Sequence, residues 1–303
     1  MGPQSPSPDI VPAIQQEPDA SRRAILQEIE GLTNRHVLNY SATAFGLPGE
    51  VMQGADILNL TRVMRKIPGK QGVDLILNSP GGKPEVAEKI ITTLRHYFDD
   101  DFRVVVPEYA KSAATVVALG ADEILMGFCS ELGPIDPQMF VPSPNDPQGR
   151  GVFRSAHAII QSVDSYVAKV HDAIAKKEPF EAYLRLLDFK PDLTFVEECR
   201  LAQRLSLEIA ERWLKAKMLT NDPAQAHTTA EVLSRADTMF SHGRSIDYRY
   251  AKDELKLKIN YLPAADPLWK QIWEVHVRGY WTLLQNRLPK LIESSSTSLI
   301  FSA

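Results

Sequence analysis

Four short apolar strand patterns alternate with amphipathic helix patterns between residues 36 and 127, and this alternation restricts the possible folds strongly. The strand patterns are HVLNY (36–40), VDLILN (73–78), FRVVV (102–106) and EILMG (123–127). Apolar residues recur about every 3.6 positions in the first two intervals between them, which is typical of helices, and a short helix fits residues 112–121 in the third. Short links between strand, helix and next strand favour right-handed crossovers. The sequence therefore predicts an α/β fold whose parallel sheet is covered by helices on both faces.

The remaining segments have a different character and define the predicted domain boundaries. Residues 1–30 begin with a polar, proline-rich stretch and are predicted to be flexible. Residues 31–178 hold the predicted sheet and its helices. Residues 179–290 are predicted to be a mainly helical extension that completes the fold, and residues 291–303 a C-terminal tail.

Composition excludes several classes of protein. The hydrophobic fraction of 44% and charged fraction of 24% are ordinary for a soluble domain, and the net charge of -4 gives no electrostatic reason to expect nucleic acid. The two cysteines, Cys129 and Cys199, lack metal-type spacing, so we expect no metal, no cofactor and a reducing compartment. Neither a signal-peptide core nor an apolar run of about 18–20 residues occurs, which predicts a cytoplasmic protein.

The turn Ser79-Pro80-Gly81-Gly82 follows the second strand pattern and opens directly into a helix. Ligands of parallel sheets bind beyond the carboxyl ends of the strands, and the next strand leads to Ser112 at the same edge. A serine hydroxyl there can attack a carbonyl while amides of the glycine turn hold the oxyanion. Ser112 can equally be a helix N-cap. A phosphate-binding loop would need a Gly-Lys-Ser/Thr ending, which GGKPE lacks.

Two motifs in order resemble the Clp-fold serine proteases: NSPGG (78–82) and SAATVVALGADEILMGFCSELGPIDPQ (112–138). The similarity is greatest to the serine dehydrogenase proteinases, which are related to signal peptide peptidase A and the NfeD-type peptidases. It spans residues 36–175 and, more faintly, 241–259. The resemblance implies a Clp/crotonase-like fold, ATP-independent endopeptidase activity on protein or peptide substrates, and a homo-oligomer. Peripheral membrane proteins are among the substrates it allows.

The same resemblance implies a role for individual residues. Ser112 matches the nucleophile, and the amides of Gly81 or Gly82, together with that of Ala113, match the oxyanion hole. Lys169, in DSYVAKVHDA (164–173), matches the general base of the NfeD-type branch, which implies a Ser-Lys dyad. The spacing from serine to lysine requires a longer loop here than in that branch.

The identity of the general base stays open at this point. Lys169 can instead be a solvated surface residue, and His157 and Lys111 are alternatives. Asp136 stands where the Clp-type branch has a histidine, and we expect it to fix the GPIDPQ turn or to meet substrate. His242 is expected to have a structural role in a turn. Two further functions remain: a crotonase-like acyl-CoA enzyme, and a proteolytically silent scaffold that binds protein partners.

Overall fold

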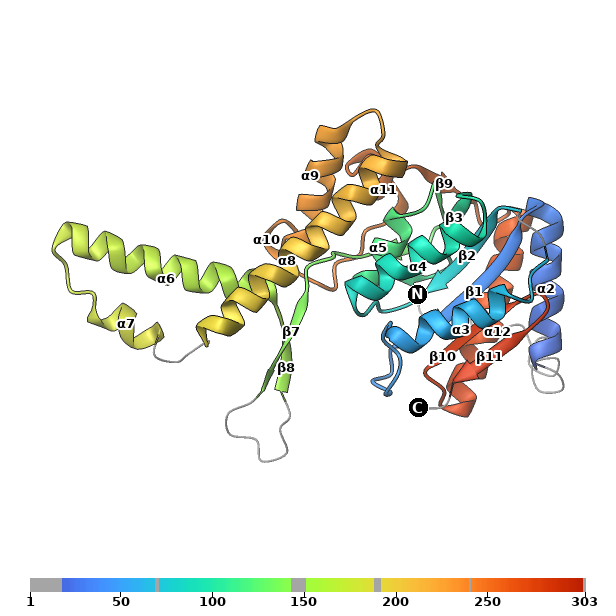
Figure 1. The fold of residues 1–303 in the computed structure, drawn as a ribbon, viewed down its shortest axis with the longest axis horizontal. Coiled ribbons are helices and arrows are strands. Elements are labelled where there is room, and N and C mark those ends of the chain that lie inside the picture. The colour runs from blue at the N-terminus through green and yellow to red at the C-terminus, as the bar shows by residue number, and fades with distance from the viewer. Residues whose placement is uncertain (1–17, 69–70, 143–150, 188–191, 240, 302–303) are drawn as a thin grey trace.

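A sheet of seven strands forms the centre of the molecule (Figure 1). The computed structural model describes residues 18–68, 71–142, 151–187, 192–239 and 241–301. In spatial order the strands are β11 (Ser298–Phe301), β10 (Lys290–Ser294), β1 (His36–Ala42), β2 (Val73–Asn78), β3 (Phe102–Val106), β5 (Ile124–Met126) and β9 (Ile259–Tyr261). The five strands from β1 to β9 run parallel, and β10 and β11 add an antiparallel edge. The predicted α/β fold with a mainly parallel sheet is confirmed.

Helices cover both faces of this sheet, as the alternation of its side chains requires. Leu75 and Leu77 of β2 point into the core under α3 (Gly54–Met64), α4 (Pro84–Tyr97) and α5 (Ala113–Leu119). Ile76, between them, packs on the opposite face, which α2 (Pro18–Thr33) and α12 (Pro267–Asn286) cover. Every residue of β2 is buried, because helices cover both faces of the sheet at this strand. Its sequence is accordingly apolar at all positions except Asp74 and Asn78.

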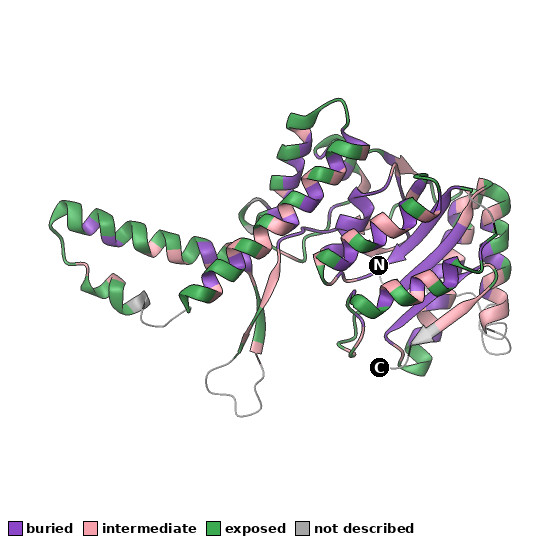
Figure 2. Cartoon of the chain, in the orientation of Figure 1, coloured by how far each residue is buried: buried purple, intermediate pink, exposed green. Residues whose placement is uncertain are grey.

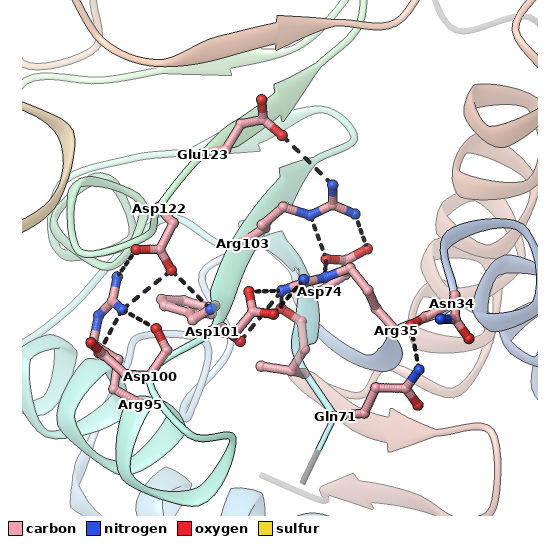
Figure 3. Close-up of polar contacts among 12 residues, drawn as sticks. Asn34, Arg35, Gln71, Asp74, Arg95, Asp100, Asp101, Arg103, Asp122 and Glu123 are labelled. Atoms are coloured by element: carbon pink, nitrogen blue, oxygen red, sulfur yellow. Dashed lines mark hydrogen bonds and ion pairs between the residues drawn. The ribbon is translucent and has the colours of Figure 1, made fainter.

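Ion pairs close the amino ends of the strands (Figure 3). The buried Asp74 carboxylate accepts from Arg35 Nε at 2.7 Å and from Arg103 at 2.8 and 2.7 Å. Arg95 pairs with Asp100 close by. These ion pairs therefore neutralise the charged side chains of Asp74 and its two arginine partners at the amino ends of the strands.

The remaining elements form a helical part and a projecting arm. The additional helices are α6 (Ala156–Lys176), α7 (Glu181–Leu187), α8 (Leu193–Trp213), the π-helix Leu214–Met218, α9 (Pro223–Ser234), α10 (Ala236–Met239) and α11 (Tyr248–Asp253). Short strands are β4 (Tyr109–Ala110), β6 (Glu131–Leu132), β7 (Gln138–Pro142) and β8 (Gly151–Ser155). Helix α6 and the β7–β8 hairpin project from the body, and α6 is largely exposed (Figures 1 and 2). Within the described residues no helix is long and apolar enough to cross a membrane.

Two predicted boundaries are wrong. The segment predicted as a tail, 291–303, contributes β10 and β11 to the sheet, because Leu291 and Ile292 bury their side chains on its two faces. Most of the described part of the segment 1–30 is helix α2, whose Leu26 is fully buried against the sheet; residues 1–17 lie outside the described residues. The predicted extension 179–290 supplies strand β9 and helix α12 to the sheet domain in addition to its other helices.

Candidate active site

A narrow ladder of backbone bridges lies beyond the carboxyl ends of the parallel strands. Its pairs are Met52–Gly82, Ser79–Ala110, Ala110–Leu132 and Leu132–Ile246. The buried Thr115 hydroxyl donates to the Ala110 carbonyl at 2.7 Å and accepts from the Gly133 amide at 3.1 Å, which ties α5 to the ladder. Five segments that are far apart in the sequence therefore meet at one edge.

Ser112 stands between β4 and α5 in a strained backbone conformation, with φ 52° and ψ −121°. Ser112 occupies the N-cap position of α5, as expected, but its side chain makes no capping hydrogen bond. Within the described part of the chain its hydroxyl has no hydrogen-bond partner, and the residue is half-buried. Non-glycine residues at positive φ cost about 1–3 kcal/mol and cluster at active sites. A strained serine at a strand-to-helix turn is the arrangement that presents a nucleophile.

The glycine turn lies directly against this serine. Gly81 has φ +100°, and a Cβ added to it would lie 2.5 Å from the Lys111 carbonyl oxygen and 2.8 Å from Ser112 Cβ. Gly82 has φ +154°, and its added Cβ would lie 2.4 Å from the Met52 nitrogen. Both positions therefore exclude a side chain. At Gly81 it would meet Lys111 and Ser112, and at Gly82 it would meet the backbone of Met52.

The backbone amides of this turn differ in their hydrogen bonding. The Gly81 N–H donates to the Ser79 hydroxyl at 3.1 Å, so it is already engaged. The N–H groups of Gly82 and Ala113 have no acceptor among the described residues. Of the three amides predicted for an oxyanion hole, these two are the ones that keep a donor available.

Asp136, which is buried, and the partly exposed His242 form a pair that the sequence did not predict. The side chain of Asp136 is fully buried, and its Oδ1 lies 2.7 Å from Nδ1 of His242, whose side chain is 29% exposed. Asp136 Oδ2 accepts from Gln138 at 2.9 Å. An ionised carboxylate can only accept, so His242 donates from Nδ1 and carries its lone pair on Nε2. His242 precedes the ladder residue Ile246 by four positions in the sequence.

Lys111 is engaged in holding the same loops. Its ammonium donates to the carbonyls of Leu132 at 3.1 Å and Arg244 at 3.2 Å, and pairs with Glu131 at 2.7 Å. A lysine ammonium has three donors, and these contacts use all of them. Lys111 thus links Arg244 to the loop at residues 131–132, and its Nζ is engaged by these three partners.

The other two candidate bases lie on α6. His157 is engaged by Gln203 at 3.0 Å and Asp237 at 3.1 Å. Lys169 is exposed, and its ammonium lies 4.8 Å from the centre of the Tyr166 ring. Helix α6 begins beside Pro137 and projects outward (Figure 1), which places Lys169 roughly 20 Å along the axis from the start. The role of Lys169 as general base stays a prediction.

Comparison with known proteins supports the predicted resemblance over part of the chain. Residues 10–146 match the family model of the ClpP-like SDH-type serine proteinases. This segment includes the glycine turn, Ser112 and Asp136, whereas Lys169 and His242 lie outside it. The resemblance inferred from the two motifs is thus confirmed for the segment that carries them.

Two curated proteins are similar to parts of this chain. An uncharacterised protein of Methanocaldococcus jannaschii is 34% identical over 125 residues, 39% of this chain and 43% of that protein. A second from the same organism is 36% identical over 84 residues, 28% of each chain. The chain spans less than half the length of these curated relatives.

Two solved structures are of mutants of the 1510-N membrane-bound stomatin-specific protease. One matches with a TM-score of 0.42 and 12% identity over 72% of this chain and 76% of that chain. The other, in complex with a substrate peptide, matches with a TM-score of 0.39 and 14% identity over 71% of this chain and 72% of that chain.

Proposed function

We propose that this protein is an ATP-independent serine peptidase that hydrolyses protein or peptide substrates, with Ser112 as the nucleophile. The observation that carries the proposal is the strained, uncapped serine held against a side-chain-free glycine turn. Neither feature stabilises the fold, since strain costs free energy and the cap is absent. Both are accounted for if a substrate carbonyl must reach Ser112 Oγ.

The proposed reaction assigns one role to each of these groups. His242 Nε2 takes the Ser112 proton as Oγ attacks the carbonyl carbon, and the Gly82 and Ala113 amides stabilise the oxyanion. Asp136 holds the imidazole in the tautomer that has a free Nε2 and stabilises the imidazolium. The imidazolium then protonates the leaving amine, and a water activated by His242 hydrolyses the acyl-enzyme.

His242 is our choice of base, in place of the predicted Ser-Lys dyad. The observation that favours it is the 2.7 Å contact with a fully buried carboxylate, which orients the ring. Lys169, by comparison, is exposed on the projecting helix α6, where its ammonium lies 4.8 Å from the centre of the Tyr166 ring. Catalytic hydrogen bonds are often long in free enzymes, so we expect Ser112 Oγ and His242 Nε2 to come within about 2.6–3.2 Å in the acyl complex.

A fluorophosphonate probe tests the proposal without knowledge of the substrate. The expected result is covalent labelling at Ser112, identified by peptide mass spectrometry, together with hydrolysis of casein. Tight binding of coenzyme A with no labelling would favour an acyl-CoA enzyme. Binding of casein with neither labelling nor cleavage would favour a silent scaffold.

Replacing Gly81 by alanine is expected to lower turnover by about 10²–10³-fold, because the new Cβ displaces Ser112 and the Ala113 amide. Gly31→Ala is the matched control. Gly31 lies in helix α2, and a Cβ added to it would have no neighbouring atom within 4 Å. Steady-state cleavage of a fluorogenic peptide measures both. Equal activities of the two variants would show that the turn does not need to be free of side chains.

Alkylation of cysteine is expected to leave the peptidase activity unchanged. Burial raises the pKa of the Cys129 thiol to about 11 and also raises the pKa of Cys199. A raised pKa keeps the thiol protonated, so at pH 8 only about one Cys129 in a thousand is a reactive thiolate. Activity measured after treatment with iodoacetamide at pH 8 checks this, and inactivation would point to a cysteine in the mechanism.

A further inference from the structure

A lysine is buried behind the glycine turn, on the antiparallel edge of the sheet. Lys290 of β10 has a side chain only 1% exposed, and its ammonium lies 2.8 and 2.7 Å from the two carboxylate oxygens of Asp56 on α3. The Tyr40 hydroxyl donates to the same carboxylate at 2.9 Å. Burial lowers the pKa of Lys290, and Asp56 opposes that shift.

Both members of this pair also hold the backbone of one short segment. Lys290 Nζ donates to the Val51 carbonyl at 3.0 Å, and Asp56 Oδ2 accepts from the Gln53 amide at 2.9 Å. Met52, between them, is therefore held from both sides.

Met52 in turn carries the glycine turn. Its amide donates to the Gly81 carbonyl at 2.7 Å, and its carbonyl accepts from the Lys83 amide at 3.2 Å. An added Cβ on Gly82 would meet the Met52 backbone at 2.4 Å, so the two chains are in close contact. The orientation of the Gly82 amide thus depends on where residues 51–53 lie.

We infer that Lys290 and Asp56 are positioning residues for the oxyanion hole, acting through residues 51–53 on the Gly81–Gly82 turn. The inference rests on the proposed function. A buried ion pair is seldom more stabilising than an apolar pair of similar volume, so stability alone gives little reason for it. A charged pair can, however, fix specific backbone groups, which an apolar pair cannot do.

The same strand provides a matched control. Glu293, three residues after Lys290, has a fully buried side chain and pairs with Arg22 of α2 at 3.1 Å on the opposite face of the sheet. Arg22 also donates to Thr282, and Asn39 donates to Glu293. This pair is equally buried, and its hydrogen bonds within the described residues do not reach residues 51–53 or the glycine turn.

The experiment compares the double variant Lys290→Met/Asp56→Asn with Arg22→Met/Glu293→Gln. Each removes both charges of one buried pair; the second variant also removes the Arg22 partner of Asp19, whose side chain is 44% exposed. We expect the first to lower kcat and the rate of fluorophosphonate labelling by about 10–100-fold, since small displacements of catalytic groups have effects of this size. KM should stay within about twofold, because ground-state binding is not changed. The control should keep kcat within about twofold at a comparable loss of thermal stability.

Each outcome decides the question. Equal labelling rates in two folded double variants would overturn the inference, as would a KM increase at constant kcat. If the first double variant does not fold, Asp56→Asn compared with Glu293→Gln makes the same test with isosteric single changes. Absence of labelling in the wild-type protein would instead refute the proposed function itself.

Discussion

Replacing Ser112 by alanine is expected to abolish peptide cleavage and fluorophosphonate labelling while the free energy of unfolding changes by less than about 0.5 kcal/mol. The serine makes no capping hydrogen bond, so its loss removes no stabilising contact. Loss of a nucleophile typically lowers kcat by about 10⁴–10⁶-fold. Peptide hydrolysis and denaturant unfolding of the same preparations measure both effects.

Ser112→Gly is the control for this variant. Glycine adopts φ near 52° without strain, so this variant should be more stable than Ser112→Ala by about 1 kcal/mol and equally inactive. If alanine instead lowered stability by about 1–2 kcal/mol and left activity intact, Ser112 would be a cap and the peptidase assignment would fail at this site.

Replacing His242 by alanine is expected to lower kcat by at least about 10³-fold with little change in KM, because the serine loses the base that accepts its proton. Asp136→Asn should lower kcat by up to about 10⁴-fold, since an amide at that position favours the wrong tautomer of the ring. His157→Ala is the control, because His157 is engaged by Gln203 and Asp237. Steady-state kinetics on a fluorogenic peptide separates kcat from KM.

Lys169→Ala provides the opposing measurement. It should leave kcat unchanged if His242 is the base. The reverse result, in which Lys169→Ala inactivates the enzyme and His242→Ala does not, would establish the Ser-Lys dyad and would require Lys169 to come from a neighbouring subunit. Dissociated protomers would then be inactive, which dilution and analytical ultracentrifugation would show.

The central strands β2 and β3 were predicted well, because a strand that is buried on both faces has a nearly continuous run of apolar residues. The ranges predicted for β2 and β3 coincide with the structure, since their residues are almost all apolar and bounded by turns. The edge of the same sheet was missed. The β10 segment KLIES alternates too weakly to predict a strand, and its burial depends on the free edge of β1.

Local sequence determined the glycine turn and Ser112. Their chemistry depends on backbone conformation and on neighbours within a few residues, which is why two short motifs were enough to find them. The proposed general base, His242, could not be predicted in this way. Asp136 and His242 are separated by 106 positions, and neither lies in a motif that specifies the other.

Only the tertiary structure brings those two side chains together, through the bridges from Ala110 to Leu132 and from Leu132 to Ile246. The same holds for Lys290, whose sequence context resembles that of a surface lysine until β10 buries it beside Asp56. Sequence patterns report burial and turns because these recur along the chain with a fixed period. Contacts between single polar residues have no period, so the packing of distant segments alone decides them.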